Sequence, residues 1–462
     1  MERLFGTDGI RGIPGEYPFV PSFLRVLGAI AAKFLPREKS FSPNGTVPKI
    51  LIGRDTRASG PSILKNLALG IGAQMRMIDC GVIPTPAISY LVPHLKAAGG
   101  IVISASHNPA EFNGIKFFDS RGLKISLELE QKIEKAVKGI SSRKFSGKPV
   151  LEDGSKYERD YADFLKSIFP PALDLSNIAL VLDCANGASY KIARPLFESL
   201  GAKVHCLGVS PNGYNINRGC GALETGPLRT AVSALKADIG IAFDGDADRA
   251  VFCDEKGDIK DGDFVLGVAA LRMQKCGFLK KQSVVLTTMS NVALEQFLSK
   301  RGISTLSVGV GDRHVTQALE NNDLSLGGEP SGHIVFRRFL RTGDGMLTAV
   351  ETLAALAESQ KPFSKILQDF KPFPQVIENV KVSSRIPLES LPHFQEELRK
   401  QELALKGRGR LFVRYSGTEP LLRIMVEGPK LNWVREIARN IAAAYRREAD
   451  LSPREKIHGQ KK

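Results

Sequence analysis

Apolar strands and helical stretches alternate along the chain in a pattern that occurs three times. Each copy has a short apolar strand, a polar loop, a helical stretch and a second apolar strand ending in glycine. The strands lie at residues 50–52 and 75–78, 179–182 and 203–207, and 284–287 and 304–308, and the helical stretches at 61–69, 190–200 and 292–300. A unit of about thirty residues is the size of a βαβ unit with a right-handed crossover. Continuous apolar strands suit sheets covered on both faces. The pattern predicts three α/β domains of similar topology.

After Pro374 the pattern changes to three further short strands and a final helix. The strands are expected at residues 380–382, 410–413 and 423–426, and the helix, with apolar residues at helical spacing, at 433–445. Turn-rich segments at 141–149 and 370–375 separate the pieces. We therefore expect an α/β protein with a mixed or parallel-sheet core in domains 1–150, 151–260 and 261–373, and a smaller α+β domain at 374–462.

Composition places the chain among ordinary globular proteins. Of its 462 residues, 43% are hydrophobic and 24% are charged. No run approaches the roughly 18 apolar residues that cross a bilayer, and charge and glycines occupy the N-terminus where a secretory segment would be apolar. We expect a soluble, cytoplasmic protein without a membrane partner. The six cysteines form no C-x-x-C pair, which favours reduced thiols over a disulfide framework or zinc site.

The charge balance points to an anionic ligand. Lys and Arg number 64 against 49 Asp and Glu, a net charge of +15. Such an excess attracts nucleic acid, acidic membranes or phosphorylated small molecules, although it also arises in a basic surface that only serves solubility. No Walker A motif, dinucleotide-binding glycine motif or stripe of basic and aromatic residues is present. We therefore expect no nucleic-acid partner.

The segment DGDADR, residues 244–249, carries alternating carboxylates between two apolar strands. Asp244, Asp246 and Asp248 can converge on one hard divalent cation, with Mg²⁺ favoured over Ca²⁺ because three carboxylates leave room for water and phosphate. An acidic surface turn is the simpler alternative. An EF-hand loop, which would use Glu255 as its last ligand, needs glycine where Arg249 stands and helices where strands are predicted.

The segment SASHNP, residues 104–109, follows an apolar strand at 100–103. Open α/β sheets bind ligands beyond the carboxyl ends of their strands, which is where Ser106 is predicted. Ser106 is either a nucleophile or a turn residue. His107 is an unfavourable base for it because adjacent side chains diverge.

Two further segments carry polar groups suited to a sugar phosphate. RYSGTEPLLR combines the components of a phosphate cradle: Arg414, Ser416, Gly417, Thr418 and Arg423. A hairpin turn with surface arginines would look similar. GEPSGH supplies a carboxylate, a hydroxyl and an imidazole, which suit a polyol: Glu329, Ser331 and His333.

Together these segments resemble the α-D-phosphohexomutase superfamily over nearly the whole chain. They occur in one order: FGTDGIRG (5–12), GRDTRASG (53–60), SASHNP, DGDADR, VGDR (310–313), GEPSGH, TGDG (342–345) and RYSGTEP. The resemblance implies four domains around a central cleft and an isomerase that moves a phosphoryl group within a hexose phosphate. FGTDGIRG resembles the branch that interconverts glucosamine 6-phosphate and glucosamine 1-phosphate. Two alternatives are a mutase of mannose or glucose phosphates and a non-catalytic sugar-phosphate-binding protein.

The resemblance also implies roles for these residues. Ser106 is expected to carry the phosphoryl group as phosphoserine, and one Mg²⁺ is expected on its oxygen and on Asp244, Asp246 and Asp248. Cations or proton transfers are expected from Arg11, Lys116, Arg249 and His333, with either Lys116 or His333 as general base.

The remaining implied groups bind substrate. Glu329 and Ser331 are expected on sugar hydroxyls, Arg313 on substrate, and Arg414, Ser416, Gly417, Thr418 and Arg423 on the phosphate that is not transferred. The implied activator is glucosamine 1,6-bisphosphate or another hexose 1,6-bisphosphate, and the implied assembly is a monomer or homodimer. The chain departs from the pattern twice, with Pro330 where branches differ and with Ala247 where this branch commonly has glycine.

Overall fold

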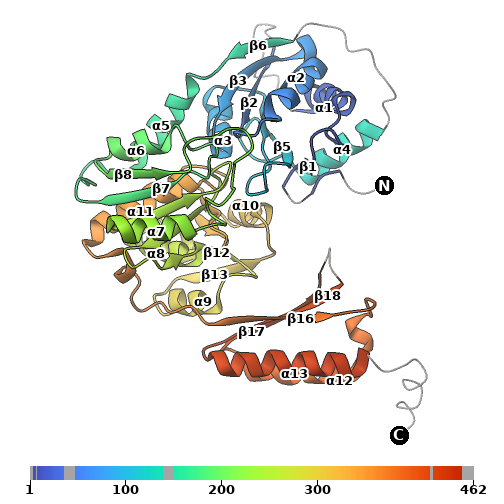
Figure 1. Cartoon of the computed structure of the whole chain (residues 1–462), viewed down its shortest axis with the longest axis vertical. Coiled ribbons are helices and arrows are strands. Elements are labelled where there is room, and N and C mark those ends of the chain that lie inside the picture. Colours follow the sequence, from blue (N-terminus) through green and yellow to red (C-terminus); the bar gives the residue numbers. More distant parts are fainter. Residues whose placement is uncertain (1–3, 7, 36–46, 139–148, 417–419, 450–462) are drawn as a thin grey trace. The chain divides into compact units, whose positions relative to one another are not determined.

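A computed structural model describes residues 4–6, 8–35, 47–138, 149–416 and 420–449 of the chain. The chain divides into two compact units (Figure 1). The first comprises residues 1–289 and 302–368, and the second residues 290–301 and 369–462.

The first sheet of the large unit has six strands in the order β1-β5-β4-β2-β3-β6. Its strands are β1 (Ile10–Gly12), β2 (Lys49–Arg54), β3 (Arg76–Val82), β4 (Gly99–Ile103), β5 (Asn113–Phe118) and β6 (Val150–Asp153). Its helices are α1 (Pro21–Phe34), α2 (Gly60–Ile71), α3 (Thr85–His94) and α4 (Leu127–Lys138). Strand β2 pairs in parallel with β3 and β4, whereas β5 is antiparallel to both of its neighbours.

The second sheet has the order β11-β10-β9-β7-β8, and the third β13-β12-β14-β15. The second contains β7 (Ala179–Asp183), β8 (Lys203–Leu207), β9 (Ile239–Phe243), β10 (Ala250–Asp254) and β11 (Ile259–Lys260), with helices α5 (Tyr157–Ile168), α6 (Ala193–Ser199) and α7 (Gly226–Leu235). The third contains β12 (Ser283–Thr287), β13 (Ser304–Val308), β14 (Leu326–Gly328) and β15 (Ile334–Phe336), with helices α8 (Gly262–Lys275), α10 (Asp312–Asn321) and α11 (Gly345–Ser359).

The predicted α/β class with mixed sheets is confirmed. In each repeat the two expected strands pair in parallel, β2 with β3, β7 with β8 and β12 with β13. Each sheet then adds antiparallel strands after its parallel core. Strand β9 is buried along its whole length, and its antiparallel return into β10 places the DGDADR segment at a tight connection.

The small unit is built on an antiparallel sheet in the order β16-β18-β17. Its elements are α9 (Val292–Ser299), β16 (Gln375–Lys381), α12 (Pro392–Leu405), β17 (Arg410–Tyr415), β18 (Leu421–Glu427) and α13 (Leu431–Ala449). The predicted α+β character is confirmed, although helix α12 had no counterpart among the expected elements. The amide of Val292 donates to the buried carboxylate of Glu427 at 2.7 Å, which ties α9 to β18.

None of the described helices combines the length and apolar character needed to cross a membrane.

Two glycines allow α1 and α2 to pack closely over the first sheet. A Cβ on Gly28 would lie 2.3 Å from the carbonyl oxygen of Leu67, and one on Gly70 would lie 1.9 Å from that of Arg25. Both positions meet backbone rather than flexible side chains, so an added methyl group requires the helices to separate.

We expect Gly70→Ala to destabilise the large unit by about 1–3 kcal/mol, the usual cost of overpacking. The matched control is Gly226→Ala, because nothing lies within 4 Å of a Cβ added there. Urea unfolding followed by near-ultraviolet circular dichroism measures both. Equal stability of the two variants would contradict the packing described here.

Candidate active site

Three buried aspartates converge in the connection between β9 and β10. Asp244, Asp246 and Asp248 are at most 3% exposed, and one carboxylate oxygen of each lies within 4.8 Å of the others. Ala247 has φ 56°, a left-handed conformation in which glycine is less strained, and it allows the turn that brings the three together. Its amide donates to the Asp244 carbonyl oxygen at 3.0 Å.

The electrostatics of this triad fit a divalent cation. Burial and the neighbouring carboxylates of Asp248 and Asp246 raise the pKa of Asp244 well above its ordinary value. Within the described chain, Oδ1 of Asp246 and Oδ1 of Asp248 are buried and accept no hydrogen bond. Buried carboxylate oxygens without partners are costly, and a hard cation removes that cost. Glu255 is not part of the cluster, because its carboxylate accepts hydrogen bonds from Ser364.

Ser106 lies against this triad, in the loop that follows β4. It is 1% exposed, and its Oγ donates to Oδ2 of Asp244 at 2.5 Å. Its left-handed φ of 52° turns the side chain out of the strand direction. His107 does not diverge from it as expected: Nδ1 of His107 lies 3.4 Å from the serine oxygen. Burial, followed by the nearby Arg249 and Arg11, lowers the pKa of His107 to about 4, so its imidazole is neutral at pH 7.

A buried arginine holds the Ser106 loop in shape. Arg57 is fully buried, and its Nε donates to Asp55 at 2.9 Å. Its Nη2 donates to the carbonyl oxygens of Ser106 at 3.0 Å and Asn108 at 2.7 Å. Asp55 also accepts from Ser104 Oγ at 2.6 Å, which in turn accepts from the Ser106 amide. Arg57 was not among the expected site residues. An arginine that braces a loop is marked in the sequence only by its position, here within GRDTRASG.

Lys116 faces the other side of the aspartate triad from β5. Its Nζ lies 2.9 Å from Asp246 and from Asp8, and 3.4 Å from Asp248. Burial lowers the pKa of Lys116, but the three carboxylates outweigh that effect and raise it well above its ordinary value. Arg11, from the neighbouring strand β1, reaches Asp8 at 3.1 Å. Asp8 was not among the expected site residues, since its ion pair with Lys116 forms only when β1 meets β5.

His333 and Glu329 come from the third sheet. His333 Nδ1 lies 3.8 Å from Oδ1 of Asp248, while its Nε2 accepts from the Gly343 amide at 3.2 Å. Burial lowers the pKa of His333, but Asp248 outweighs it and the net change is upward. Gly343 is in the TGDG segment, and a Cβ there would clash with the imidazole at 2.4 Å.

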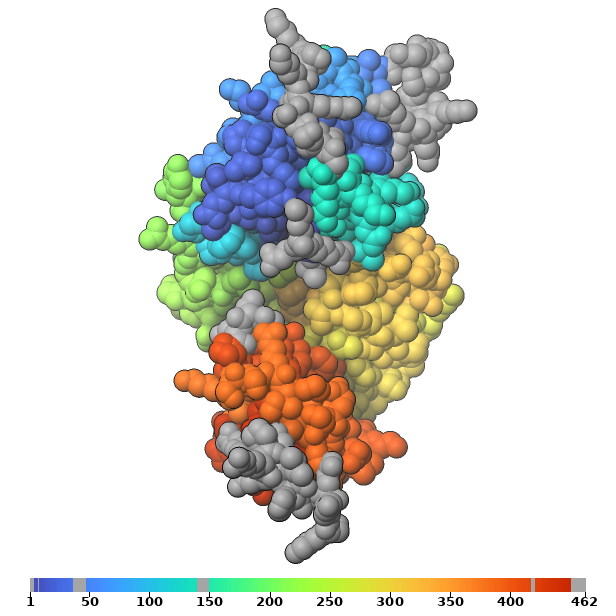
Figure 2. All heavy atoms as spheres, turned by 90° about the vertical axis from the view of Figure 1, so that its right-hand side faces the viewer, coloured from blue at the N-terminus to red at the C-terminus, as the bar shows by residue number. Residues whose placement is uncertain are grey.

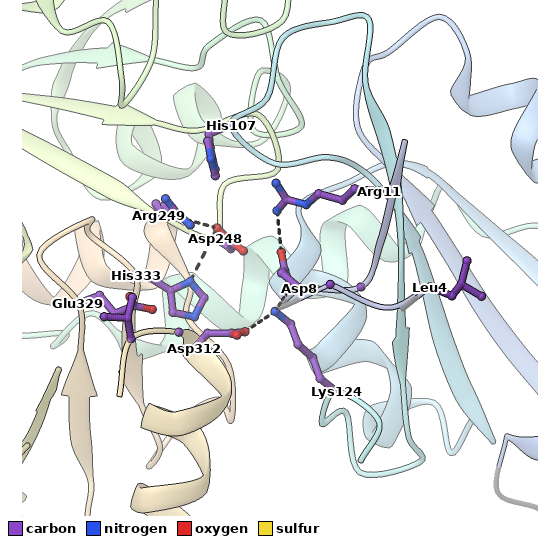
Figure 3. A pocket seen from close by; sticks show the side chains of 14 residues that line it. Leu4, Asp8, Arg11, His107, Lys124, Asp248, Arg249, Asp312, Glu329 and His333 are labelled. Atoms are coloured by element: carbon purple, nitrogen blue, oxygen red, sulfur yellow. Dashed lines mark hydrogen bonds and ion pairs between the residues drawn. The ribbon is translucent and has the colours of Figure 1, made fainter. Parts of the chain in front are cut away.

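A cavity of about 530 Å³ opens beside these groups (Figure 3). Its lining includes charged and imidazole side chains from all three sheet regions: Asp8, Arg11, His107, Lys124, Asp248, Arg249, Asp312, Glu329 and His333. Such a wall, with charges of both signs, suits a small and highly polar ligand. Four of the buried site residues lie next to this lining and are not part of it: Ser106, Lys116, Asp244 and Asp246.

Two predicted binding residues occupy other positions in the large unit. Arg313 pairs with Glu130 of α4 and lines a neighbouring cavity of about 440 Å³. Ser331 belongs to the same segment as Glu329 but does not line the cavity of Figure 3, and its buried Oγ has no hydrogen-bond partner among the described residues.

In the small unit, two arginines are brought together by strand register. Arg414 on β17 lies directly opposite Arg423 on β18, so both side chains share one face. Like charges opposite each other are unfavourable unless an anion lies between them. Arg385, absent from the expected set, donates to the Ser416 carbonyl oxygen at 2.7 Å. Gly417 and Thr418 lie outside the described residues.

Family models match almost the entire chain. They are described as phosphoglucomutase/phosphomannomutase α/β/α domain I at residues 2–144, domain II at 159–257, domain III at 261–373 and C-terminal domain at 378–444. A phosphoglucosamine mutase of Bdellovibrio bacteriovorus is 41% identical over 96% of this chain and 98% of the relative. One from a Geobacter species is 42% identical over 96% and 97%.

Two solved structures share the fold. A phosphoglucomutase/phosphomannomutase family protein of Burkholderia thailandensis has a TM-score of 0.77 at 22% identity, over 96% of this chain and 97% of that one. An Aspergillus fumigatus N-acetylphosphoglucosamine mutase, solved with GlcNAc-6P and magnesium, has a TM-score of 0.66 at 18% identity, over 96% of each chain.

We expect Asp246→Asn to abolish binding of a divalent cation, because the variant loses one of three converging charges. Isothermal titration with Mg²⁺ and Mn²⁺ measures the loss. Glu255→Gln is the matched control, because an EF-hand loop would need that carboxylate and the observed site does not. Loss of affinity in the control would favour the EF-hand alternative.

We expect Arg57→Lys to loosen residues 104–112, because an ammonium cannot replace the several guanidinium bonds to the loop. Charge-assisted hydrogen bonds contribute about 1.5–3 kcal/mol each, so amide exchange in this loop should rise by about 10- to 100-fold. Arg54→Lys is the control, since Arg54 pairs with Asp79 instead. Hydrogen exchange by mass spectrometry compares them; unchanged protection in Arg57→Lys would refute a bracing role.

Proposed function

The chain belongs to the phosphoglucomutase/phosphomannomutase family, and from that premise we propose that it is a phosphoglucosamine mutase, interconverting glucosamine 6-phosphate and glucosamine 1-phosphate. The family models confirm the resemblance to the α-D-phosphohexomutases and the assignment to the isomerases. Glucosamine phosphate is proposed as the substrate because the relatives that are 41–42% identical over nearly their whole length are phosphoglucosamine mutases. We keep the expected domain limits, 1–150, 151–260, 261–373 and 374–462, as part of the proposal.

The observation that carries the mechanism is the contact between Ser106 and the aspartate triad. In the proposed cycle Ser106 bears a phosphoryl group, and a hydroxyl of the bound sugar monophosphate attacks its phosphorus. The P–Oγ bond of the serine breaks as the new P–O bond forms, and the hydroxyl proton leaves to a base. The resulting bisphosphate reorients, and Ser106 Oγ then attacks its other phosphorus. The P–O bond to the sugar breaks, and the proton held by the base returns to the sugar oxygen.

Charge control is the main contribution of the surrounding residues. Asp244, Asp246, Asp248 and an oxygen of phosphorylated Ser106 would hold Mg²⁺, which when bound neutralises charge on the transferring group. Lys116 keeps its proton near neutral pH, because three carboxylates surround its ammonium, and it therefore stabilises charge rather than acting as base.

The other proposed contacts follow the position of each group. Arg11 and Arg249 line the cavity and supply positive charge, and Glu329 accepts from sugar hydroxyls. His333 remains the other predicted base; in the conformation seen here its Nε2 accepts from the Gly343 amide.

Arg414 and Arg423 hold the phosphate that is not transferred, together with Ser416, Gly417 and Thr418. Arg313, paired with Glu130, and Ser331 complete the proposed substrate-binding set.

A hexose 1,6-bisphosphate, such as glucosamine 1,6-bisphosphate, would prime Ser106 by donating a phosphoryl group to it. We propose a cytoplasmic location, where the sugar phosphates of amino-sugar metabolism are made. A monomer or a homodimer would satisfy this mechanism, since the described catalytic groups come from one chain.

We expect purified protein with Mg²⁺ and the matching bisphosphate to convert glucosamine 1-phosphate with a higher kcat/KM than mannose or glucose 1-phosphate. Ser106→Ala should lose turnover by at least about 10⁴-fold, because no acceptor remains for the phosphoryl group. The same variant should keep its affinity for the sugar phosphate in a titration experiment. Retained turnover in Ser106→Ala would exclude the phosphoserine mechanism, and preference for another hexose would exclude glucosamine as the substrate.

A further inference from the structure

Asp312 is a carboxylate on the cavity wall to which the proposed mechanism assigns no contact with the substrate. It is the first residue of α10, and it lines the cavity together with Glu329 and His333 from the same sheet region (Figure 3). The ion-pair partner of its carboxylate among the described residues is Lys124 of the first sheet region. Its side chain is 13% exposed, so it is accessible from the cavity.

Each other carboxylate on this wall has a role or several cationic partners, whereas Asp312 shares its ion-pair partner Lys124 with Asp8. Asp248 belongs to the aspartate triad, and Asp8 is paired with Lys116, Arg11 and Lys124. Glu329 is assigned above to sugar hydroxyls.

A further carboxylate in a cavity for a phosphorylated ligand repels that ligand's phosphate. This repulsion is removed if the ligand itself presents a positive charge at Asp312. Among the candidate substrates, glucosamine phosphate has one, the ammonium at C2, whereas glucose and mannose phosphates have a neutral hydroxyl there.

Lys124 shows that this part of the wall accommodates an ammonium group. Its Nζ lies between the carboxylates of Asp8 and Asp312 and is within hydrogen-bond distance of both. A carboxylate can accept more than one hydrogen bond, so a second ammonium can approach Asp312 from the cavity while Lys124 remains paired with Asp8.

An ion pair that only holds the third sheet region against the first is also made by the next residue, Arg313. Arg313 pairs with Glu130 of α4, and neither of these residues lines the cavity of Figure 3. Figure 2 shows the teal surface of the chain near helix α4 beside the gold surface of the third sheet region, the two parts that this pair joins. The pair at Asp312 differs because both of its members face the cavity.

We propose that Asp312 selects amino sugars by accepting a charged hydrogen bond from the C2 ammonium of the hexosamine phosphate. This assignment rests on the proposed function. Asp312 would act with Glu329, which holds neutral hydroxyls of the same ring, so that one region of the wall distinguishes the amino sugar from its hydroxyl analogues.

The test compares kcat/KM for glucosamine 1-phosphate and glucose 1-phosphate in wild type and Asp312→Asn. The substitution keeps shape and removes charge. We expect the ratio of the two values to fall by about 10- to 100-fold, the usual effect of losing one charge-assisted hydrogen bond, with glucose 1-phosphate turnover retained. Asp312→Glu keeps the charge and should restore part of the preference.

Glu320→Gln is the matched control, because it breaks an ion pair with Arg337 on the same helix α10, outside the cavity of Figure 3. Its substrate ratio should equal that of wild type. If Asp312→Asn lowers kcat/KM for both sugars equally, as loss of a structural contact would, the role of Asp312 is refuted while the proposed function stands. If wild type itself does not prefer glucosamine 1-phosphate, the proposed function and this inference both fail.

A measurement on wild type alone tests the inference should Asp312→Asn fail to fold. N-acetylglucosamine 1-phosphate carries a neutral amide in place of the ammonium. We expect its kcat/KM to be at least about 10-fold below that of glucosamine 1-phosphate. Equal values would overturn the assignment, because charge at C2 would then contribute nothing to selection.

Discussion

The site depends on the confinement of opposite charges where water is largely excluded. Asp244, Asp246 and Asp248 are almost completely buried, and so is the ammonium of Lys116 that faces two of them. Charges held this way cost desolvation energy that only close partners or a cation can offset. Hydrogen bonds and ion pairs within the chain hold this arrangement without a ligand, so the protein supplies a preorganised charged centre.

All three α/β sheet regions contribute to holding that centre. From the first, Thr85 donates through its side chain at 2.5 Å and its amide at 2.9 Å to Asp246. From the third, the amide of Gly345 donates at 3.0 Å to the Ala247 carbonyl oxygen, and a Cβ on Gly345 would clash with Arg249 at 2.3 Å. The segment at residues 244–249 is therefore held by hydrogen bonds from both neighbouring sheet regions, and its geometry depends on how the three regions pack.

Two polar surfaces of the chain are held in different ways. The loop that contains Ser106 is braced by buried Arg57 and can change little without breaking several hydrogen bonds. Arg414 and Arg423, by contrast, lie opposite each other on neighbouring strands of a separate compact unit. The first surface is thus fixed by buried hydrogen bonds, whereas the second is set by strand register.

Much of the fold and the chemistry could be predicted from local sequence, because both have short-range signals. The repeated strand–helix–strand spacing predicted the α/β domains, and alternating aspartates between apolar strands predicted a cation site. What remained open was every contact between residues distant in the chain. Asp8 with Lys116 and Arg57 with the Ser106 loop carry no periodicity, since each pair forms only when separate strands become neighbours. Sequence determined which side chains are available for phosphoryl transfer; tertiary structure decided which of them meet, because burial and partner charge arise only from packing.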